Sequence, residues 1–272
     1  MQICKKYRSP AEKTFSRGVF YLRPQGLTRK FRVKPEKEEV HFLSGVYQGR
    51  TTGDPLAAVI YNGDVLSADY DSLKHKPRPS HGDYTAAVRA LGCNDPRGGG
   101  HTSGRLTAPL TVAGALAITY LKTAHIAVHA DVLDEEALRA RAAAAKADGD
   151  SVGGVLETAI LGLPAGVGEP YFDSVESKLA HLAFSIPAVK GIEFGSGFGF
   201  ADQKGSEAND AFRMQGKRIV TATNHNAGLN GGISNGMPVV FRTAVKPTPS
   251  IYKTQDTVDY LSLIHISEPT RR

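Results

Sequence analysis

The sequence has few of the residues on which several protein classes depend. Cys4 and Cys93 are the only cysteines among 272 residues, which gives no sign of a disulfide framework and favours reduced thiols. No set of His and Cys residues has zinc spacing, so we predict no metal ion. There is no Trp, and the basic N-terminal segment lacks regularly interleaved aromatic residues, which argues against nucleic-acid binding.

Long apolar runs are also missing. The most apolar stretch, residues 108–128, is interrupted by Thr, Lys, His and Pro109, so it predicts a buried helix followed by a strand and not a membrane span. The first residues, MQICKKYRSP, contain no apolar core of a signal peptide. We therefore predict a cytoplasmic protein without a membrane partner.

Acidic residues are scarce at the N-terminus. Residues 1–37 hold 11 Lys and Arg but 2 Asp and Glu, a net charge of +9, whereas the remainder holds 22 and 25, a net charge of −3. One interpretation is a solvated, poorly ordered end. The other is a segment that binds nucleic acid, a membrane surface or phosphorylated small molecules.

The rest of the chain predicts a mixed fold. Alternating and β-branched segments predict strands, and amphipathic segments predict helices, with Asp83 and Asp134 as N-caps. The expected strands are 40–47, 55–61, 152–163, 188–194 and 238–245, and the expected helices are 83–91, 105–122, 134–147 and 175–184. Because the two types do not alternate regularly, an α+β or layered sandwich fold fits better than a doubly wound sheet.

Two pairs of similar strings suggest an internal repeat. GRTTGDPL (49–56) resembles GISNGMPV (232–239), and KPRPS (76–80) resembles KPTPS (246–250). A duplicated half-domain explains the pattern. Chance matching of turns explains it equally well, because turns reuse Gly and Pro for backbone reasons.

Three segments combine cations with restrained or glycine-loosened backbone. In KHKPRPSHGDYT (74–85) prolines stiffen the chain around Arg78 and His81, which suits an anionic ligand and proton transfer, although a basic surface loop is the alternative. DPRGGGHTSGRLT (95–107) feeds a helix start through three glycines, an arrangement that favours a phosphate or carboxylate.

The third segment is TNHNAGLNGGISNGMPVV (223–240), which leads into VKPTPSIYK (245–253). Lys246 with Thr248 and Ser250 can bind a phosphate, and His225 is a second candidate proton carrier. GSGFGFA (195–201) does not match the dinucleotide-binding glycine pattern, so a Rossmann site is not expected.

Together these segments resemble chorismate synthases. The resemblance covers residues 34–259 in the family's order, through LSGVYQGRTTGDPL, KPRPSHGDYT, RGGGHTSGR, VGGVLETAILGLPAGVGEP, AVKGIEFGSGF, GSEAND, NHNAGLNGGISNGMPVVFRTAVKPTPSI and KTQDTVD. It implies an α+β fold, a β-α-β sandwich with internal pseudo-symmetry, assembled as a homotetramer. The same pseudo-symmetry would account for the repeated strings.

The resemblance also implies a reaction. Its members convert the small molecule 5-enolpyruvylshikimate 3-phosphate to chorismate and phosphate by a 1,4-anti elimination, the last step of the shikimate pathway. They need reduced flavin mononucleotide (FMN), which lends an electron transiently to the leaving phosphate system and is not consumed. NADPH is the reductant in bifunctional members.

Residue roles follow from the resemblance position by position. His81 matches the proton-carrying histidine beside the flavin, and Arg78 and Arg105 match substrate-binding arginines. Lys246 matches the partner of the flavin phosphate. The cofactor-binding positions are His101, which replaces a common Arg, and Thr102, Ser103, Gly104, Ala188, Gly231, Lys246, Pro247, Thr248, Pro249 and Ser250. Pro187 replaces an Asn beside Ala188, and Arg29 matches an arginine linked to reduced nicotinamide.

The two ends depart from the family pattern. A Gly-Glu-Ser-His-Gly loop with the other catalytic histidine and an Arg-x-Asp-Pro segment with a catalytic aspartate are not found. We expect a poorly matched basic segment (1–33), an incomplete chorismate synthase-like domain (34–259) and a non-native tail (260–272) that resembles translated adaptor sequence. We therefore expect little or no turnover from these residues alone. The alternatives are an inactive or non-folding fragment, and a basic module that binds anions or nucleic acid.

Overall fold

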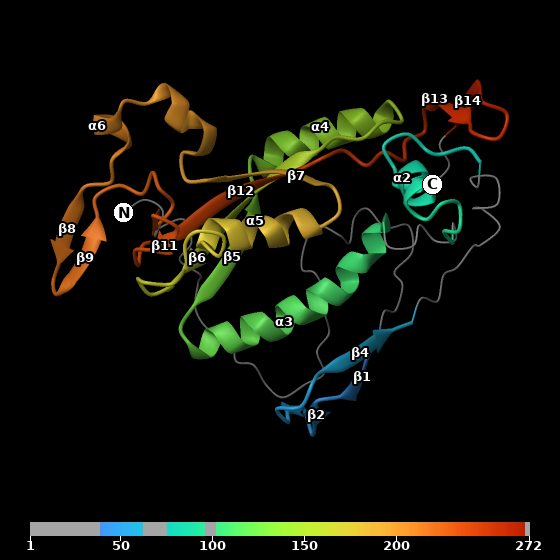
Figure 1. Ribbon diagram of the computed structural model, residues 1–272. Coiled ribbons are helices and arrows are strands. Elements are labelled where there is room, and N and C mark those ends of the chain that lie inside the picture. The colour runs from blue at the N-terminus through green and yellow to red at the C-terminus, as the bar shows by residue number, and fades with distance from the viewer. Residues whose placement is uncertain (1–38, 62–74, 96–101, 270–272) are drawn as a thin grey trace. The chain divides into compact units, whose positions relative to one another are not determined.

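The computed structural model describes residues 39–61, 75–95 and 102–269, which form two compact units (Figure 1). The larger unit contains Gly114–Thr257 and residues 265–269. The smaller contains the described residues up to Ala113 together with Val258–Ile264. Arg29 and His101 lie outside the described residues, so their roles stay predictions. No helix in the described ranges has both the length and the apolar character needed to cross a membrane.

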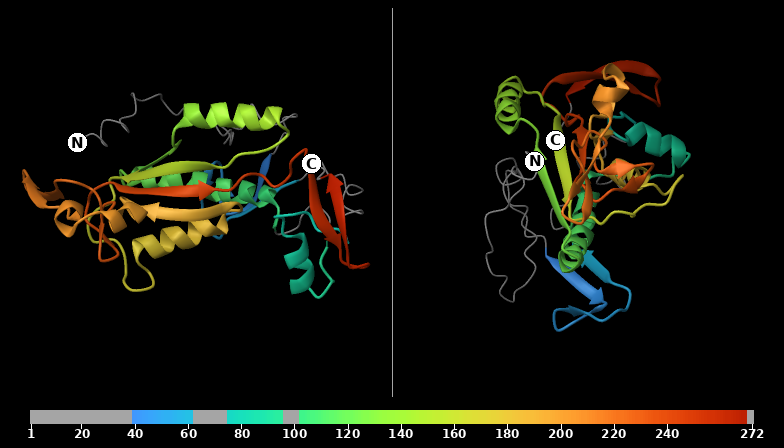
Figure 2. Two further views of the ribbon diagram at one scale, coloured as in Figure 1. Left: turned by 90° about the horizontal axis from the view of Figure 1, so that it is seen from above. Right: turned by 90° about the vertical axis from the view of Figure 1, so that its left-hand side faces the viewer.

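A four-stranded antiparallel sheet forms the centre of the larger unit. Its strands, in the order β5-β6-β12-β7, are Ala127–Val132, Gly154–Leu161, Val239–Val245 and Val189–Phe194. In Figure 2 (left), β12 and β7 run side by side, as their hydrogen bonding requires. Strand β12 lies between two partners and is rich in β-branched residues, which suit a half-buried pleated surface. The strands expected at 152–163, 188–194 and 238–245 are confirmed.

Among the described residues, three α-helices and one 3₁₀ helix lie wholly within the larger unit. They are α4 (Glu135–Ala147), α5 (Val175–Ser185), α6 (Gly205–Ala208) and the 3₁₀ helix η5 (Gly197–Asp202). Ser174 caps α5, because its side chain accepts a hydrogen bond from the amide of Ser177. Asp134 precedes α4 as expected, but it makes no side-chain cap because its backbone is left-handed at φ 50°. Its expected N-cap position is therefore confirmed, but without a capping hydrogen bond from its side chain.

Three hairpins in the described part of the chain lie wholly outside the strands that the sequence predicted. Two are β8 (Phe212–Gln215) with β9 (Arg218–Thr221), and β10 (Leu229–Asn230) with β11 (Ile233–Ser234). The third pairs β13 (Thr254–Asp259) with β14 (Ile264–Pro269). The predicted tail therefore contributes a strand, and its non-native origin stays a prediction because pairing does not report on origin.

The smaller unit contains two short antiparallel pairs and a helix. The pairs are β1 (Val40–Ser44) with β4 (Ala57–Ile60), and β2 (Val46–Tyr47) with β3 (Arg50–Thr51). Helix α2 (Asp83–Arg89) has Gly82 at its N-cap and not Asp83. The Asp83 carboxylate instead binds Arg78, which corrects the expected cap.

Helix α3 (Thr107–Thr123) follows a 3₁₀ turn, η4 (Gly104–Leu106). Its sequence predicted a buried helix, but Val112 is its only buried residue and Tyr120 is 74% exposed. Leu110 and Ile118 are also exposed. The apolar residues of α3 are distributed around its whole circumference, so packing against one neighbouring surface cannot cover all of them. The expectation of burial is therefore wrong for the described chain.

The first pair of repeated strings forms the same local structure twice. Each position of the second string lies 183 residues after its counterpart (232 − 49), and at that offset β2 matches β10 and β3 matches β11. Gly45 and Gly228 have φ values of 76° and 74°. Their carbonyls accept from Thr52 and Asn235 at 3.1 and 2.9 Å. Shared strands, torsions and hydrogen bonds favour duplication over chance.

A glycine substitution tests how tightly the second copy of this motif is built. Gly228→Ala is expected to lower the free energy of unfolding by about 2 kcal/mol, because a Cβ would lie 2.7 Å from the carbonyl oxygens of Met237 and Pro238. Gly231→Ala shares the left-handed backbone but meets nothing within 4 Å, so about 1 kcal/mol is expected. Urea unfolding measures both; equal losses would contradict the close packing around Gly228.

Candidate functional site

The Lys246–Ser250 segment begins where β12 ends beside β7. The Lys246 amide donates a hydrogen bond to the Ala188 carbonyl at 2.9 Å, directly beyond the paired residues Val245 and Val189. Ala188 has a left-handed backbone with φ 73°. Two positions that were predicted from separate segments, Ala188 and Lys246, are therefore neighbours at one end of the sheet.

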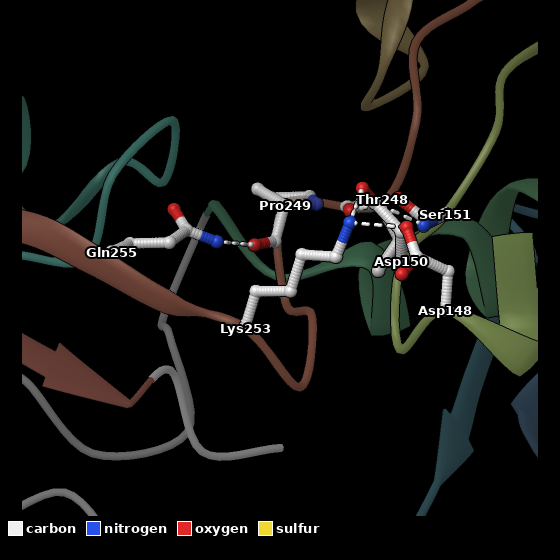
Figure 3. Close-up of polar contacts among 7 residues, drawn as sticks. All are labelled: Asp148, Asp150, Ser151, Thr248, Pro249, Lys253 and Gln255. Carbon is white, nitrogen blue, oxygen red and sulfur yellow. Dashed lines mark hydrogen bonds and ion pairs between the residues drawn. The ribbon is translucent and has the colours of Figure 1, made fainter.

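Side chains from outside the Lys246–Ser250 segment hold it in place (Figure 3). The Ser151 hydroxyl donates to the Thr248 carbonyl at 2.6 Å, and the Gln255 amide donates to the Pro249 carbonyl at 3.2 Å. A Cβ on Gly153 would lie 2.4 Å from the Val245 carbonyl oxygen and 3.1 Å from the Pro247 ring. The loop that follows α4 thus packs directly against the predicted phosphate-binding segment.

Lys253, three residues beyond Ser250, forms ion pairs with the loop that follows α4 (Figure 3). Its ammonium group binds Asp148 at 2.5 Å and Asp150 at 2.9 Å. The hydrogen bonds with Asp148 and Asp150 raise the pKa of Lys253, and the hydrogen bond from Lys253 lowers the pKa of Asp150. Because two carboxylates offset its charge, Lys253 links the loop after α4 to the chain that follows Ser250.

The donor set of Lys246–Ser250 fits a phosphate monoester. One ammonium group and the hydroxyls of Thr248 and Ser250 supply charge-assisted and neutral hydrogen-bond donors within five residues. The stiff prolines at 247 and 249 limit the conformations between those donors. The residues present therefore suit the phosphate of a flavin mononucleotide.

Gly231 lies at the other end of β12, in the turn between β10 and β11 (Figure 1). It has φ 60°, and nothing lies within 4 Å of the position that a Cβ would take, so a ligand can approach its backbone closely. The seven residues of β12 span about 20 Å. Gly231 precedes β12 and Lys246 follows it, and their contact with one cofactor stays a prediction.

In the smaller unit, Arg78 and His81 belong to one tight turn. Arg78 donates from Nε and Nη2 to the two carboxylate oxygens of Asp83 at 2.8 and 2.9 Å, and its backbone amide adds a third bond at 3.0 Å. The His81 amide donates to the Arg78 carbonyl at 3.2 Å. Asp83, which the sequence suggested only as a cap, therefore fixes the conformation of the turn.

The ion pair also sets the charge state of Asp83. Burial acts to raise the pKa of Asp83, but the hydrogen bonds and charge of Arg78, together with the charge of His81, outweigh burial and lower the pKa. The side chains of Arg78 and Asp83 are 15% and 19% exposed. A substrate that binds Arg78 thus meets a guanidinium whose charge is already partly balanced.

Thr102, in the second predicted segment, lies against this turn. A Cβ on Gly82 would lie 2.6 Å from Cγ2 of Thr102, so the residue after His81 contacts that threonine closely. Ser103 accepts from the Arg105 amide at 3.3 Å, and the Thr107 hydroxyl donates to the Gly104 carbonyl at 2.7 Å. These bonds shape the η4 turn that carries Arg105.

The predicted site residues therefore fall into two groups. The smaller unit carries Arg78, His81 and Thr102–Arg105, and the larger unit carries Ala188, Gly231 and Lys246–Ser250. Convergence of the two groups on one pocket stays a prediction. Among the described residues, no group of three or more His, Cys, Asp or Glu is placed to hold a metal ion.

Comparison with known proteins identifies a family whose members match the sequence across both groups of residues. The family model described as chorismate synthase matches residues 18–135 and 131–267, and so reaches beyond residues 34–259 on both sides. The chain is 41% identical to chorismate synthase from Thermococcus kodakarensis, over 87% of this chain and 74% of that protein. It is 50% identical to the one from Chitinophaga pinensis, over 84% and 69%.

A solved structure agrees with the sequence comparisons. The crystal structure of a chorismate synthase matches with a TM-score of 0.61 at 26% identity, over 77% of this chain and 71% of that one. Helices and an antiparallel central sheet, with the Lys246–Ser250 segment at one end of that sheet, define an α+β protein. The chain belongs to the chorismate synthase family, a family of lyases in the shikimate pathway. The predicted fold class and family are confirmed.

Proposed function

We propose that the chain binds FMN and 5-enolpyruvylshikimate 3-phosphate for the formation of chorismate and phosphate. The observation that carries the proposal is the Lys246–Ser250 segment, where a lysine and two hydroxyls lie on a backbone fixed by Ala188 and Ser151. A substrate with one phosphate and two carboxylates demands further cations, which Arg78 and Arg105 supply. When bound, the reduced flavin would donate an electron transiently to the substrate as its C–O bond to phosphate breaks and would recover that electron afterwards, so no net reductant would be consumed.

Each residue group has a distinct task in this proposal. Lys246, Thr248 and Ser250 bind the cofactor phosphate, with Pro247 and Pro249 shaping the segment. Gly231, Ala188 and residues 101–104 offer surfaces to the flavin. His81 moves a proton at its imidazole beside the flavin, while Arg78 and Arg105 orient the substrate so that proton loss and C–O cleavage occur on opposite faces.

The assembly and the reductant belong to the same proposal. A homotetramer in the cytoplasm would cover apolar surface such as that of α3, where Leu110, Ile118 and Tyr120 are exposed. NADPH would reduce the flavin through the segment that holds Arg29. Gel filtration with light scattering tests the assembly directly.

Flavin titration tests the proposed phosphate site. Lys246→Ala is expected to weaken FMN binding by about 10- to 100-fold, because it removes a charged hydrogen-bond donor. Riboflavin, which has no phosphate, should bind the variant and the unaltered chain equally. Quenching of flavin fluorescence measures both ligands.

Lys146→Ala is the matched control, since Lys146 lies in the last turn of α4, outside the predicted segments. The proposal fails if the unaltered chain binds neither flavin, or if Lys246→Ala weakens riboflavin as much as FMN. Binding is the readout because it reports on the phosphate site directly.

A further inference from the structure

The Asp210 carboxylate accepts four hydrogen bonds, and all four donors belong to one turn, residues 223–226. It lies between α6 and β8, in the GSEAND string, to which the family resemblance assigned no task. Oδ1 accepts from the Thr223 hydroxyl at 2.6 Å and the His225 amide at 2.8 Å. Oδ2 accepts from the backbone and side-chain amides of Asn226 at 2.8 and 3.1 Å.

This arrangement uses the whole hydrogen-bonding capacity of the carboxylate. An ionised Asp has about four acceptor sites, so the four donors saturate Asp210. Burial acts to raise the pKa of Asp210, but the hydrogen bonds from Thr223, Asn226 and His225 outweigh burial and lower the pKa. The carboxylate is therefore ionised near neutral pH, and its bonds to the turn are of the stronger, charge-assisted kind.

The turn that Asp210 organises also fixes the imidazole of His225. The His225 carbonyl accepts from the Ser196 amide at 2.8 Å, and Nδ1 of its ring lies 3.3 Å from the Ser196 hydroxyl. A Cβ on Gly195 would lie 1.8 Å from the same carbonyl oxygen, so only glycine permits this approach. Asp210 bonds the backbone of His225 and not its ring, so the three residues are not a catalytic triad.

The same turn leads directly to Gly231. Ala227 is fully buried and Leu229 is 3% exposed, and the Asn224 side chain donates to the Pro238 carbonyl at 2.9 Å. Residues 223–229 are therefore fixed at one end by Asp210 and packed into the core at the other. A substitution at Asp210 is therefore expected to shift the β10–β11 hairpin, because this short, tightly packed segment connects the two.

We propose that Asp210 is a positioning residue for the flavin-binding end of β12, acting through the Thr223–Asn226 turn on His225 and Gly231. The inference rests on the proposed function, because Gly231 is a proposed flavin contact. It assigns different roles to two segments: Lys246–Ser250 binds the phosphate, and the turn held by Asp210 shapes the surface that contacts the flavin ring.

Flavin binding distinguishes this role from that of Lys246. Asp210→Asn keeps the size of the side chain but replaces one acceptor oxygen with a donor, so it opposes two of the four N–H and O–H donors. It is expected to weaken FMN and riboflavin by the same factor, about tenfold, and to alter the absorbance spectrum of bound flavin. Lys246→Ala should change the FMN affinity alone.

A second variant tests whether Asp210 acts through the turn. Thr223→Val removes one donor and is expected to weaken both flavins by about threefold. Because both changes disrupt one network, the Asp210→Asn/Thr223→Val double variant should bind flavin no more weakly than Asp210→Asn alone. Asp202→Asn, in η5 and exposed, is the matched control and should leave flavin binding unchanged.

Amide hydrogen exchange of the ligand-free chain provides an independent readout. The His225 and Asn226 amides should exchange faster in Asp210→Asn, while amides in β6 stay protected, which separates local loss of order from global unfolding. Unchanged flavin affinity and spectrum in a folded Asp210→Asn variant overturn the inference. If the unaltered chain binds no flavin, the proposed function fails. The inference about Asp210 is tested separately by amide exchange: additive effects of Asp210→Asn and Thr223→Val on the exchange rates would overturn it.

Discussion

Replacing Asp83 by alanine is expected to lower the free energy of unfolding by about 4 kcal/mol, the largest loss among the substitutions considered. The reason is that Arg78, 15% exposed, loses a bidentate partner and a backbone acceptor in one step. Urea unfolding measures the loss. In the Arg78→Ala/Asp83→Ala double variant the loss should be clearly smaller than the sum of the two single losses.

The same ion pair predicts a pH dependence with a definite sign. The pKa of Asp83 is lowered in the folded chain, so the unfolded chain binds the proton more tightly. Its contribution to stability is therefore present above the unfolded pKa, near 4, and is lost as the pH falls through the folded pKa. Asp83→Asn should flatten the fall in the urea midpoint below about pH 4. An identical acid profile in both proteins would contradict the role of Asp83.

Replacing Arg242 by leucine is expected to lower the free energy of unfolding by about 3 kcal/mol. Arg242 lies in the middle of β12, where Nε donates to Glu157 at 3.1 Å and Nη1 to Glu193 at 3.4 Å. The Glu157 side chain is only 11% exposed. The loss lies at the low end for a broken buried pair, because the Arg242 side chain is 40% exposed and solvent screens it.

The register of the sheet explains why this arginine matters. Asp131 pairs opposite Glu157, Glu157 opposite Arg242, and Arg242 opposite Glu193, so three carboxylates and one guanidinium form a row across four strands. Removing the cation leaves like charges side by side. Glu157→Leu combined with Arg242→Leu should recover much of the loss, and a double variant less stable than Arg242→Leu alone would contradict this explanation.

The strands and helices with continuous apolar patterns could be predicted from the sequence. Val239–Val245 reads as a strand because β-branched residues fill it, and Val175–Ser185 reads as a helix behind its serine cap. The β8–β9 hairpin was missed. Apolar and polar residues alternate in β8, but only over the four residues 212–215, and Phe212 and Met214 are largely exposed and not packed into a core.

The candidate site could be predicted only in part, because the sequence indicates candidate ligand-binding residues but not the residues that position them. Lys246 stands out beside prolines and hydroxyls, but its supporting Ser151 is 97 residues away from Thr248. Asp210 binds a turn that begins 13 residues later, beyond a hairpin. Partners at such distances leave no local pattern, so the fold alone identifies them.

A crystal structure of the chain with oxidised FMN and 5-enolpyruvylshikimate 3-phosphate tests the account most directly. We predict the cofactor phosphate within hydrogen-bonding distance of Lys246 and the hydroxyls of Thr248 and Ser250, with the His81 imidazole beside the flavin ring. A cofactor phosphate bound at Thr102–Arg105, with Lys246 directed into solvent, would contradict the assignment of the phosphate site.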